Sequence, residues 1–352
     1  MIEGKAAPAE AGMADFSARL QRYRDLIAPY LRDVAPDREP KRHLYGLIED
    51  HLSRSGKGLR PALAIATCRA FGGRDEDVLS VAAALEMLHN AFLIHDDIED
   101  GSELRRDRPA MYVEQGVPLA VNVGDAMQAL SIRLARRSAE RIGPAGAWRM
   151  LDEFDHMLME SLEGQAIEIG WVRDNHCPVT EDDYLLMTLK KTCWYSFIHP
   201  CRIGALVARP DDPDLDRFNR FGYFLGLAFQ LQDDILNLVG EAKKYGKEIG
   251  GDLWEGKRTL ILADVFSKAD KLETGRLRTI LAKTRAQRVT REIEWMYVLI
   301  RKYGSIDHAS GIAEQFAEAA AREVDSAFAG APEGENRAFV RDLISYAVKR
   351  PR

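Results

Sequence analysis

Residues 79–100, LSVAAALEMLHNAFLIHDDIED, decide the fold, because they predict one long apolar helix that ends in a run of acids. Positions four residues apart share a helix face, so Asp96 and Asp100 point the same way, and His89 lies on that face. Like charges at this spacing repel, and the negative end of the helix dipole adds to the repulsion. A divalent cation such as Mg²⁺, which prefers oxygen ligands, would reverse both effects. The stretch therefore predicts a metal site at the end of a buried helix.

A second predicted helix, FGYFLGLAFQLQDDILNLVG at residues 221–240, repeats this arrangement. Its polar stripe begins at Gln230, includes one of the pair Asp233–Asp234 and ends at Asn237. Two carboxylates among Leu, Ile and Phe side chains are costly unless they are paired or bind a metal. A single acidic run is usually a solvated surface, but two runs that each interrupt an apolar helix favour a metal site.

The acids at 181–183 provide a contrast within the same chain. Thr180 precedes them as a predicted N-cap, so Asp182 and Asp183 fall in the first turn of a helix, where the helix dipole favours negative charge. We interpret these acids as capping residues without a catalytic role.

Basic residues adjoin both acidic motifs, as a site for anionic phosphates requires. Arginine binds a phosphate through two parallel hydrogen bonds. The GxxxxGKS/T pattern of a P-loop is absent. Each basic residue alone is an ordinary surface charge, but their order along the chain favours a diphosphate site. The candidates are Lys57, Arg60, Arg105, Arg106, Lys190, Lys191, Lys247, Lys257 and Arg258.

The remaining chain is also predicted to be helical, because apolar residues recur with period 3.6 and the alternation typical of strands is nearly absent. Residues 1–14, rich in Ala, Glu and Gly, are predicted to be a disordered lead-in, and residues 15–352 a single all-α domain. The predicted helices are 16–34, 42–53, 59–71, 76–99, 119–141, 145–169, 181–207, 213–239, 258–268, 275–284, 288–302, 305–328 and 336–349.

The composition is that of a soluble globular protein, with 46% hydrophobic and 30% charged residues among 352. A formal net charge of −6 argues against nucleic-acid binding, which needs a basic surface. The four cysteines lack zinc-ligand spacing and are expected to be reduced thiols. No stretch approaches the roughly 18 apolar residues of a membrane span, so we expect a cytoplasmic protein without a transmembrane segment.

Eight motifs resemble, in order, those of the trans-prenyl diphosphate synthases, and within them the geranylgeranyl diphosphate synthases. The resemblance runs from about residue 40 to the C-terminus and implies the isoprenoid synthase fold, a helical bundle around a central active-site cavity. The motifs are GKGLRP (56–61), LHNAFLIHDDIED (88–100), ELRRDRP (103–109), VNVGDAM (121–127), EGQAIEIGW (163–171), KKTCWYS (190–196), GLAFQLQDDILN (226–237) and GGDLWEGKRTL (250–260).

The resemblance also implies a metal cofactor and a homodimer. Asp96, Asp97 and Asp100 would hold two Mg²⁺ ions and Asp233 a third, with Asp234 beside them, and Mn²⁺ would substitute for Mg²⁺. Three positions depart from the family pattern. Asn237 stands where the last acid of the second motif is expected. Asp107 stands where Gly is common, and Tyr112 stands where His is common.

The basic and polar residues of the motifs would hold two substrates. The resemblance implies that isopentenyl diphosphate is contacted by Lys57, Arg60, His89 and Arg106. The second substrate, an allylic diphosphate with a dimethylallyl, geranyl or farnesyl chain, would be contacted by Arg105, Lys191, Lys247 and Lys257. Thr192 and Gln230 would lie beside the carbocation that forms from the allylic diphosphate. The resemblance therefore implies a catalytic role for these two residues, for Lys191 and Lys247, and for the metal-binding acids.

The implied reaction is a head-to-tail (1′-4) condensation that lengthens a trans-prenyl chain, with a C20 product. Ala91 and Phe92 lie one turn before Asp96, where Phe92 either closes the cavity floor or packs in the core. A C15 or a longer product is the alternative. Two remoter alternatives are a class I terpene cyclase, which needs a different second motif, and a non-catalytic synthase subunit, which is expected to lack the first acidic motif.

Overall fold

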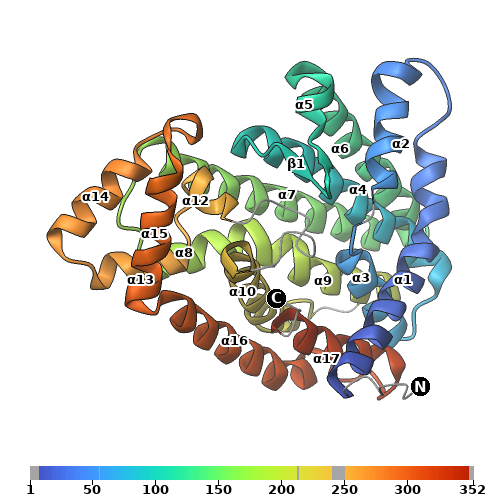
Figure 1. Ribbon diagram of the computed structural model, residues 1–352. Coiled ribbons are helices and arrows are strands. Elements are labelled where there is room, and N and C mark those ends of the chain that lie inside the picture. Colours follow the sequence, from blue (N-terminus) through green and yellow to red (C-terminus); the bar gives the residue numbers. More distant parts are fainter. Residues whose placement is uncertain (1–7, 55, 212–213, 240–249, 349–352) are drawn as a thin grey trace, which may run out of the picture.

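The computed structural model of the protein describes residues 8–54, 56–211, 214–239 and 250–348. The described chain is helical apart from one hairpin, β1 (Leu104–Arg105) paired with β2 (Arg108–Pro109), which confirms the predicted all-α class (Figure 1). The helices are α1 (Pro8–Val34), η1 (Lys41–Tyr45), α2 (Gly46–Ser53), α3 (Leu59–Ala70), α4 (Asp75–Asp100), α5 (Met111–Gln115), α6 (Val117–Ala139), α7 (Gly143–Arg173), α8 (Glu181–Thr188), η2 (Leu189–Ile198), α9 (His199–Ala208), α10 (Arg217–Val239), α12 (Gly251–Glu255), α13 (Leu260–Lys268), α14 (Lys271–Leu281), η3 (Arg285–Gln287), α15 (Thr290–Tyr303), α16 (Ser305–Ala327) and α17 (Glu335–Val348).

Helix α1 differs from the prediction at its start. It begins at Pro8, eight residues before the predicted start at residue 16. Ala, Glu and Met favour helix locally, and the next turns are anchored because Phe16 and Leu20 are buried in the core. A helix that is anchored at one end can extend into a segment of good helix formers.

Helix α4 is the centre of the larger core and carries the first acidic motif at its C-terminus. It packs against α6, α3 and α1, and nearly all of its residues from Val78 to Ala91 are buried. By length and composition α4 could cross a membrane, which contradicts the prediction that no stretch approaches that length. However, 78% of its most apolar 18-residue window is buried inside the protein, as expected for a core helix.

The predicted helix at 181–207 is divided by η2, a π-helix that separates α8 from α9. Glycines let η2 approach its two neighbours closely. A Cβ atom on Gly164 of α7 would lie 2.3 Å from the backbone nitrogen of Lys191, and one on Gly226 of α10 would lie 2.6 Å from Cys193 Sγ. π-Helical turns are rare and occur often at functional sites. This one carries Lys191 and Thr192, which the motifs assign to the active site.

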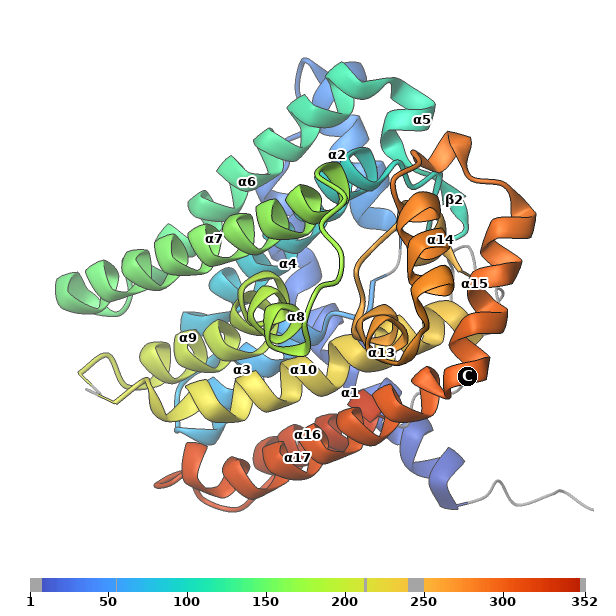
Figure 2. The ribbon, with the colours of Figure 1, turned by 90° about the vertical axis from the view of Figure 1, so that its left-hand side faces the viewer.

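The long helices form layers that can be followed in Figure 2, where α6 and α7 run side by side above α10, and α16 and α17 lie below it. One core cluster joins α1, α3, α4, α6 and α17, and a second joins α13, α14, α15 and α16. Helix α10 contributes to both clusters, since Leu225 belongs to the first and Leu231 to the second. The second acidic motif therefore lies on the helix that connects the two cores.

Gly164→Ala should disturb the packing of α7 on η2, because the new Cβ would overlap backbone atoms, which cannot move aside cheaply. We expect a loss of about 1–3 kcal/mol in the free energy of unfolding, measured with urea, together with reduced activity. Gly170→Ala, on the same helix with no atom within 4 Å of its Cβ, is the matched control and should keep or raise stability. Equal stability of the two variants would contradict the close approach.

Candidate active site

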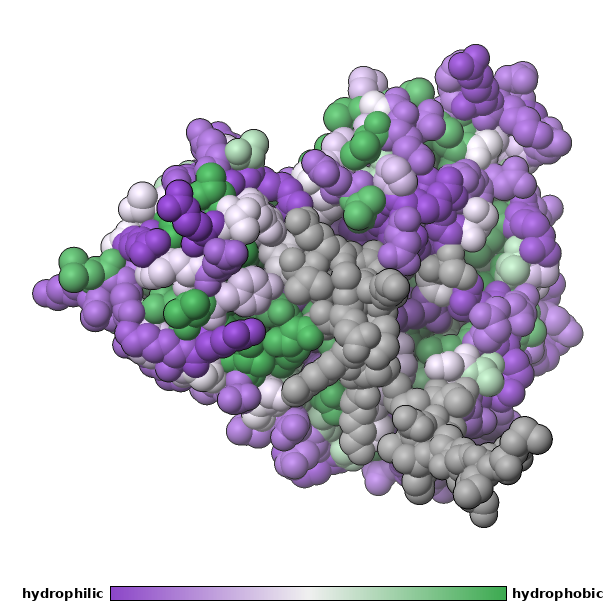
Figure 3. Space-filling view, in the orientation of Figure 1, coloured by the Kyte–Doolittle hydropathy of each residue, from purple (hydrophilic) through white to green (hydrophobic). Residues whose placement is uncertain are grey.

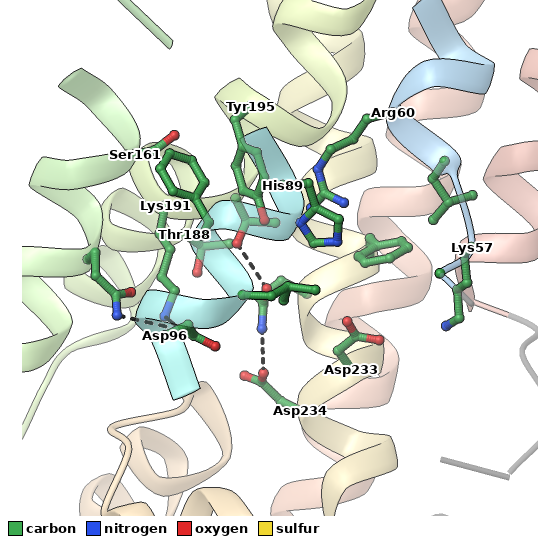
Figure 4. A pocket seen from close by; sticks show the side chains of 18 of the residues that line it. Lys57, Arg60, His89, Asp96, Ser161, Thr188, Lys191, Tyr195, Asp233 and Asp234 are labelled. Atoms are coloured by element: carbon green, nitrogen blue, oxygen red, sulfur yellow. Dashed lines mark hydrogen bonds and ion pairs between the residues drawn. The ribbon is translucent and has the colours of Figure 1, made fainter. Parts of the chain in front are cut away.

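A cavity of about 950 Å³ lies between the two acidic helices, with η2 and the loop after β1 at its sides. Figure 4 shows Lys191 beside Asp96 on one side of it, and Arg60 and Lys57 on the opposite side. Asp97, Asp100 and Ala91 do not line the cavity, and Lys247 lies outside the described residues. The predicted site residues that do line it are Lys57, Arg60, His89, Phe92, Asp96, Arg105, Arg106, Lys191, Thr192, Gln230, Asp233, Asp234 and Lys257.

Lys191 connects the first acidic motif to η2 and α7. Its ammonium group lies 3.6 Å from Asp96 Oδ1 and forms a closer ion pair with Glu168 of α7. Burial disfavours the charged lysine, but Glu168 and Asp96 outweigh this effect and raise its pKa above the ordinary value. Lys191 is therefore a charged lysine beside the leading acid of the motif.

Arg105 neutralises the second acid. Its Nε donates to Asp97 Oδ1 at 2.8 Å, and its Nη2 makes a shorter contact with the same oxygen and lies 3.4 Å from Asp96 Oδ2. Both partners are almost fully buried. Burial opposes the charge of Arg105, but the pull of Asp97 raises its pKa. The Asp97 carboxylate is thus directed at Arg105 and away from the cavity.

Lys257 pairs with the last acid of the motif. Its ammonium group lies 2.6 Å from Asp100 Oδ2 and 3.1 Å from Glu255 Oε2. Burial raises the pKa of Asp100 to about 7, against the opposing effect of Lys257. This ion pair joins α4 to the turn that follows α12.

The turn that carries Lys257 is fixed from behind by two buried arginines. Gly256 has φ +75°, and a Cβ atom there would lie 2.2 Å from Arg288 Nη2. Arg288 donates to the carbonyls of Trp254, Ile280 and Leu281, and Arg258 donates to Asn175 Oδ1 at 2.8 Å. The turn also depends on α10, because Asn237 Oδ1 accepts from the backbone nitrogen of Asp252 at 3.1 Å.

The second acidic motif is held by a chain of hydrogen bonds. Tyr184 donates to Asp234 Oδ2 at 2.7 Å, and Gln230 Nε2 donates to Asp234 Oδ1 at 2.8 Å. Thr192 in turn donates to Gln230 Oε1 at 2.9 Å. Burial raises the pKa of Asp234 to about 7. Asp233, one position earlier, faces the cavity in Figure 4 and lines it.

The opposite end of the cavity is basic. The Arg60 guanidinium lies 4.2 Å from the centre of the Tyr195 ring, and its Nη2 donates to Ser196 Oγ at 2.8 Å. Burial and the neighbouring Arg60 and Arg106 keep the pKa of His89 well below its usual range, so its imidazole is neutral. His89 Nδ1 is buried without a hydrogen-bond partner among the described residues, as is Arg60 Nε. These groups are available to an anion.

Arg106 reaches this end from a tight hairpin turn. Arg106 and Asp107 join β1 to β2 with φ values of +54° and +60°, the left-handed pair of a two-residue hairpin. This conformation favours Gly, Asn and Asp, which explains why Asp107 replaces the usual Gly. Arg106 Nη1 donates to Asn90 Oδ1 at 3.3 Å and to the carbonyl of Arg54.

The carboxylates fit a hard divalent cation. Among the described residues, no three His, Cys, Asp or Glu side chains gather closely enough to hold an ion by themselves. Mg²⁺ commonly takes only one or two carboxylates and completes its shell with water and substrate phosphates, so acids on both sides of a cavity suit it. Burial raises the pKa values of Asp100 and Asp234, and a bound cation would favour their charged forms.

A sequence model described as polyprenyl synthetase matches residues 41–299. The chain belongs to the polyprenyl synthetase family. Polyprenyl synthetases are prenyltransferases, so the enzyme class that the motifs predicted is confirmed.

The chain is similar in sequence and in fold to several geranylgeranyl diphosphate synthases. The geranylgeranyl diphosphate synthase of Sulfolobus acidocaldarius is 32% identical over 295 residues, which cover 83% of this chain and 85% of that protein. The structure of geranylgeranyl pyrophosphate synthetase from Pyrococcus horikoshii matches with a TM-score of 0.84 and 29% identity, covering 96% and 99% of the two chains. The Corynebacterium glutamicum geranylgeranyl pyrophosphate synthase, complexed with isoprenyl diphosphate and magnesium, matches with a TM-score of 0.76 and 25% identity, covering 96% and 98%. The predicted isoprenoid synthase fold is confirmed.

Several site residues of this polyprenyl synthetase were not predicted from its sequence. Glu168 and Gln165 lie in the EGQAIEIGW motif, and with Ser161 they form a polar stripe on α7 that lines the cavity. The spacing of these polar residues, four and then three positions apart, could have indicated that this face of α7 lines a cavity. Tyr195 lies in the KKTCWYS motif but was not singled out, and Tyr184 carried no signal, because an aromatic residue on a helix is usually part of the core. The predicted capping role of the acids at 181–183 is confirmed, since Thr180 and Asp183 form a capping box.

The raised pKa of Asp234 makes a testable contribution to stability. The Asp234 carboxyl of the folded protein holds a proton up to about pH 7, whereas in the unfolded chain it releases the proton near its ordinary pKa of 3.8. Between about pH 4 and 7 the unfolded state therefore binds fewer protons than the folded state. The contribution of Asp234 to the free energy of unfolding falls as the pH rises through this range and then stays constant.

Burial lowers the pKa of three histidines, so their contribution to stability changes with pH in the opposite direction to that of Asp234. These histidines are His51, His89 and His199. The measurement is therefore a difference between wild type and Asp234→Asn, from urea unfolding with a chelator. We expect wild type to lose stability relative to the variant between pH 5 and 7, by up to about 1.4 kcal/mol per pH unit. A difference that does not change with pH would contradict the assignment.

Proposed function

We propose that this enzyme condenses isopentenyl diphosphate with an allylic diphosphate, head to tail (1′-4), to form geranylgeranyl diphosphate. The main support for two diphosphate substrates is that one cavity holds two separate groups of cations, one among the acids of α4 and one around Arg60. Two diphosphates need two such groups. The relatives named geranylgeranyl diphosphate synthase support the C20 product, with farnesyl diphosphate or a longer chain as the alternative.

The homoallylic substrate, isopentenyl diphosphate, would bind at the basic end. Lys57, Arg60 and Arg106 supply positive charge there, and the neutral His89 offers a hydrogen bond without adding a further charge. The allylic diphosphate would bind beside α4. Its diphosphate would attract Arg105, Lys191 and Lys257, which pair with the motif acids in the structure, and Lys247 is expected to join them.

We propose Mg²⁺ as the cofactor, three ions in number, with Mn²⁺ as a substitute. Asp96 and Asp233 line the cavity and would hold ions directly, and Asp100 would join them once Lys257 moves from it to the diphosphate. Asp97, held by Arg105, and Asp234, held by Tyr184 and Gln230, would support these ligands without contacting the metal. Asn237 would not be a ligand, since its oxygen positions Asp252. The ions would supply neutralisation of the diphosphate leaving group. The magnesium in the Corynebacterium glutamicum relative supports the choice.

The reaction would proceed by ionisation. The carbon–oxygen bond of the allylic diphosphate breaks, both electrons leave with the diphosphate, and Lys191 and Lys257 stabilise the negative charge. The double bond of isopentenyl diphosphate then forms the new carbon–carbon bond, and a proton is lost to the departing diphosphate. Thr192 and Gln230 would stabilise the cation through oxygen atoms, and their mutual hydrogen bond fixes the Gln230 amide.

The far wall of the cavity would control chain length and exclude water. Phe92 lines the cavity and packs edge-to-face on Tyr195, with ring centroids 5.6 Å apart. Ala91 is fully buried in the core beside it, and its small side chain would let the wall be deepened by substitution of Phe92. The growing chain would extend along this wall until Phe92 stops it.

We also propose a cytoplasmic homodimer. The four cysteines are free, as expected in a reducing compartment. Large exposed apolar side chains favour a protein interface. More than half of those that the structure describes belong to α6 and α7, which lie side by side: Val117, Val121, Ile132, Trp148, Leu151, Met159, Leu162 and Ile169. Sedimentation of the purified enzyme as a monomer at micromolar concentration would contradict this proposal.

Incubation with Mg²⁺, isopentenyl diphosphate and each allylic primer in turn tests the proposed reaction. We expect a C20 diphosphate as the main product, identified by chain length after dephosphorylation, and no product when a chelator removes the metal. A terpene cyclase would release diphosphate from the primer alone, and a non-catalytic subunit would leave every primer unchanged. Either result would refute condensation.

Replacement of Phe92 tests the wall. Phe92→Ala should lengthen the main product by at least one C5 unit, because the cavity becomes deeper, and Phe92→Leu should give an intermediate distribution. The measurement is the product distribution at equal conversion. Unchanged chain lengths in both variants would remove Phe92 as the determinant.

A further inference from the structure

Helix α1 forms a wall of the active-site cavity, although it precedes the family match, which begins at residue 41. The side chains of Ser17, Leu20, Gln21 and Arg24 line the cavity, and their spacing of three and four residues places them on one face of α1. Arg24 is the cation of this face. No motif that aligns with the family points to it.

The wall is held firmly in place by α17. Phe16 stacks on Phe339 with ring centroids 5.1 Å apart, and Tyr23 packs on the same ring at 4.9 Å. Arg19 forms an ion pair with Asp342 at 2.5 Å. The position of Arg24 is therefore set by the core and does not depend on a surface contact.

Arg24 lies over the glycine turn that presents Lys57 and Arg60. A Cβ atom on Gly58, which has φ +65°, would lie 2.4 Å from Arg24 Cγ, and Arg24 Nη1 donates to Gln21 Oε1 at 3.0 Å. Burial lowers the pKa of Arg106, and the nearby charges of Arg105 and Arg24 lower it further against the opposing effect of Glu86.

Four cations thus converge on the end of the cavity assigned to isopentenyl diphosphate. Glu86 is an acid among them, since a Cβ on Gly56 would lie 3.2 Å from Glu86 Oε1 and 2.6 Å from Arg106 Nη2. Like charges repel, so cations gathered at one end of a cavity favour an anion between them. We infer that Arg24 is a further binding residue for the diphosphate of the homoallylic substrate, contributed by the helix that precedes the family's conserved motifs. The inference rests on the proposed condensation.

Arg24→Met tests this, because methionine keeps an unbranched stem over Gly58 and removes the charge. Arg22→Met is the matched control. It makes the same change on the same helix, but Arg22 is exposed, pairs with Glu335 at 3.6 Å and does not line the cavity. Arg24→Lys restores the charge and should recover much of the affinity.

The readouts are binding of isopentenyl diphosphate by calorimetry without primer, and KM for each substrate. We expect Arg24→Met to weaken binding and raise KM for isopentenyl diphosphate about tenfold, as loss of one charged hydrogen bond predicts. KM for the allylic substrate and kcat should stay within about twofold, and Arg22→Met should match wild type.

Two outcomes overturn the inference separately from the proposed function. If wild type elongates primers while Arg24→Met binds isopentenyl diphosphate normally, the condensation stands and the role of Arg24 falls. If Arg24→Met and Arg22→Met weaken binding equally, the effect comes from overall charge, and the role of Arg24 falls as well. A wild type that elongates no primer refutes the proposed function and the inference with it.

Discussion

Pairing of buried charge is the constraint on which the rest of this structure depends. Asp97 and Asp100 are too deeply placed to stay ionised without partners, and Arg105 and Lys257 supply them. Each cation comes from an element outside α4, so the ion pairs also fix the hairpin and the turn after α12. These ion pairs hold both kinds of charge that the substrates need. When metal and diphosphate bind, the acids would bind the metal and the cations would bind the phosphate.

Backbone packing brings these charges together. Gly164 and Gly226 let η2 lie against α7 and α10, and η2 places Lys191 and Thr192 in the cavity. Gly256 gives space to Arg288 behind the turn of Lys257. Small residues therefore position the large charged ones, and this explains why the site motifs contain glycines beside their cations.

The sequence was sufficient to predict the helical class, both acidic helices and every lysine and arginine of the described cavity lining except Arg24, because amphipathic periodicity and charge spacing are local signals. It did not predict the π-helix at 189–198, since that geometry follows from contacts with two other helices. It also did not distinguish Asp97 from Asp96, because the difference lies in where Arg105 reaches. Glu168 and Arg24 were missed for a similar reason. Their roles depend on which helix faces the cavity.

The central claim is that the cations paired with the acids of α4 exchange partners when substrate and metal bind. A crystal structure with Mg²⁺ and an unreactive allylic diphosphate analogue tests this most directly. We predict Asp96, Asp100 and Asp233 at about 2.0–2.1 Å from Mg²⁺, with Lys191 and Lys257 moved onto the diphosphate. Lysines that remain paired with Glu168 and Asp100, or metal held by other residues, would contradict the account.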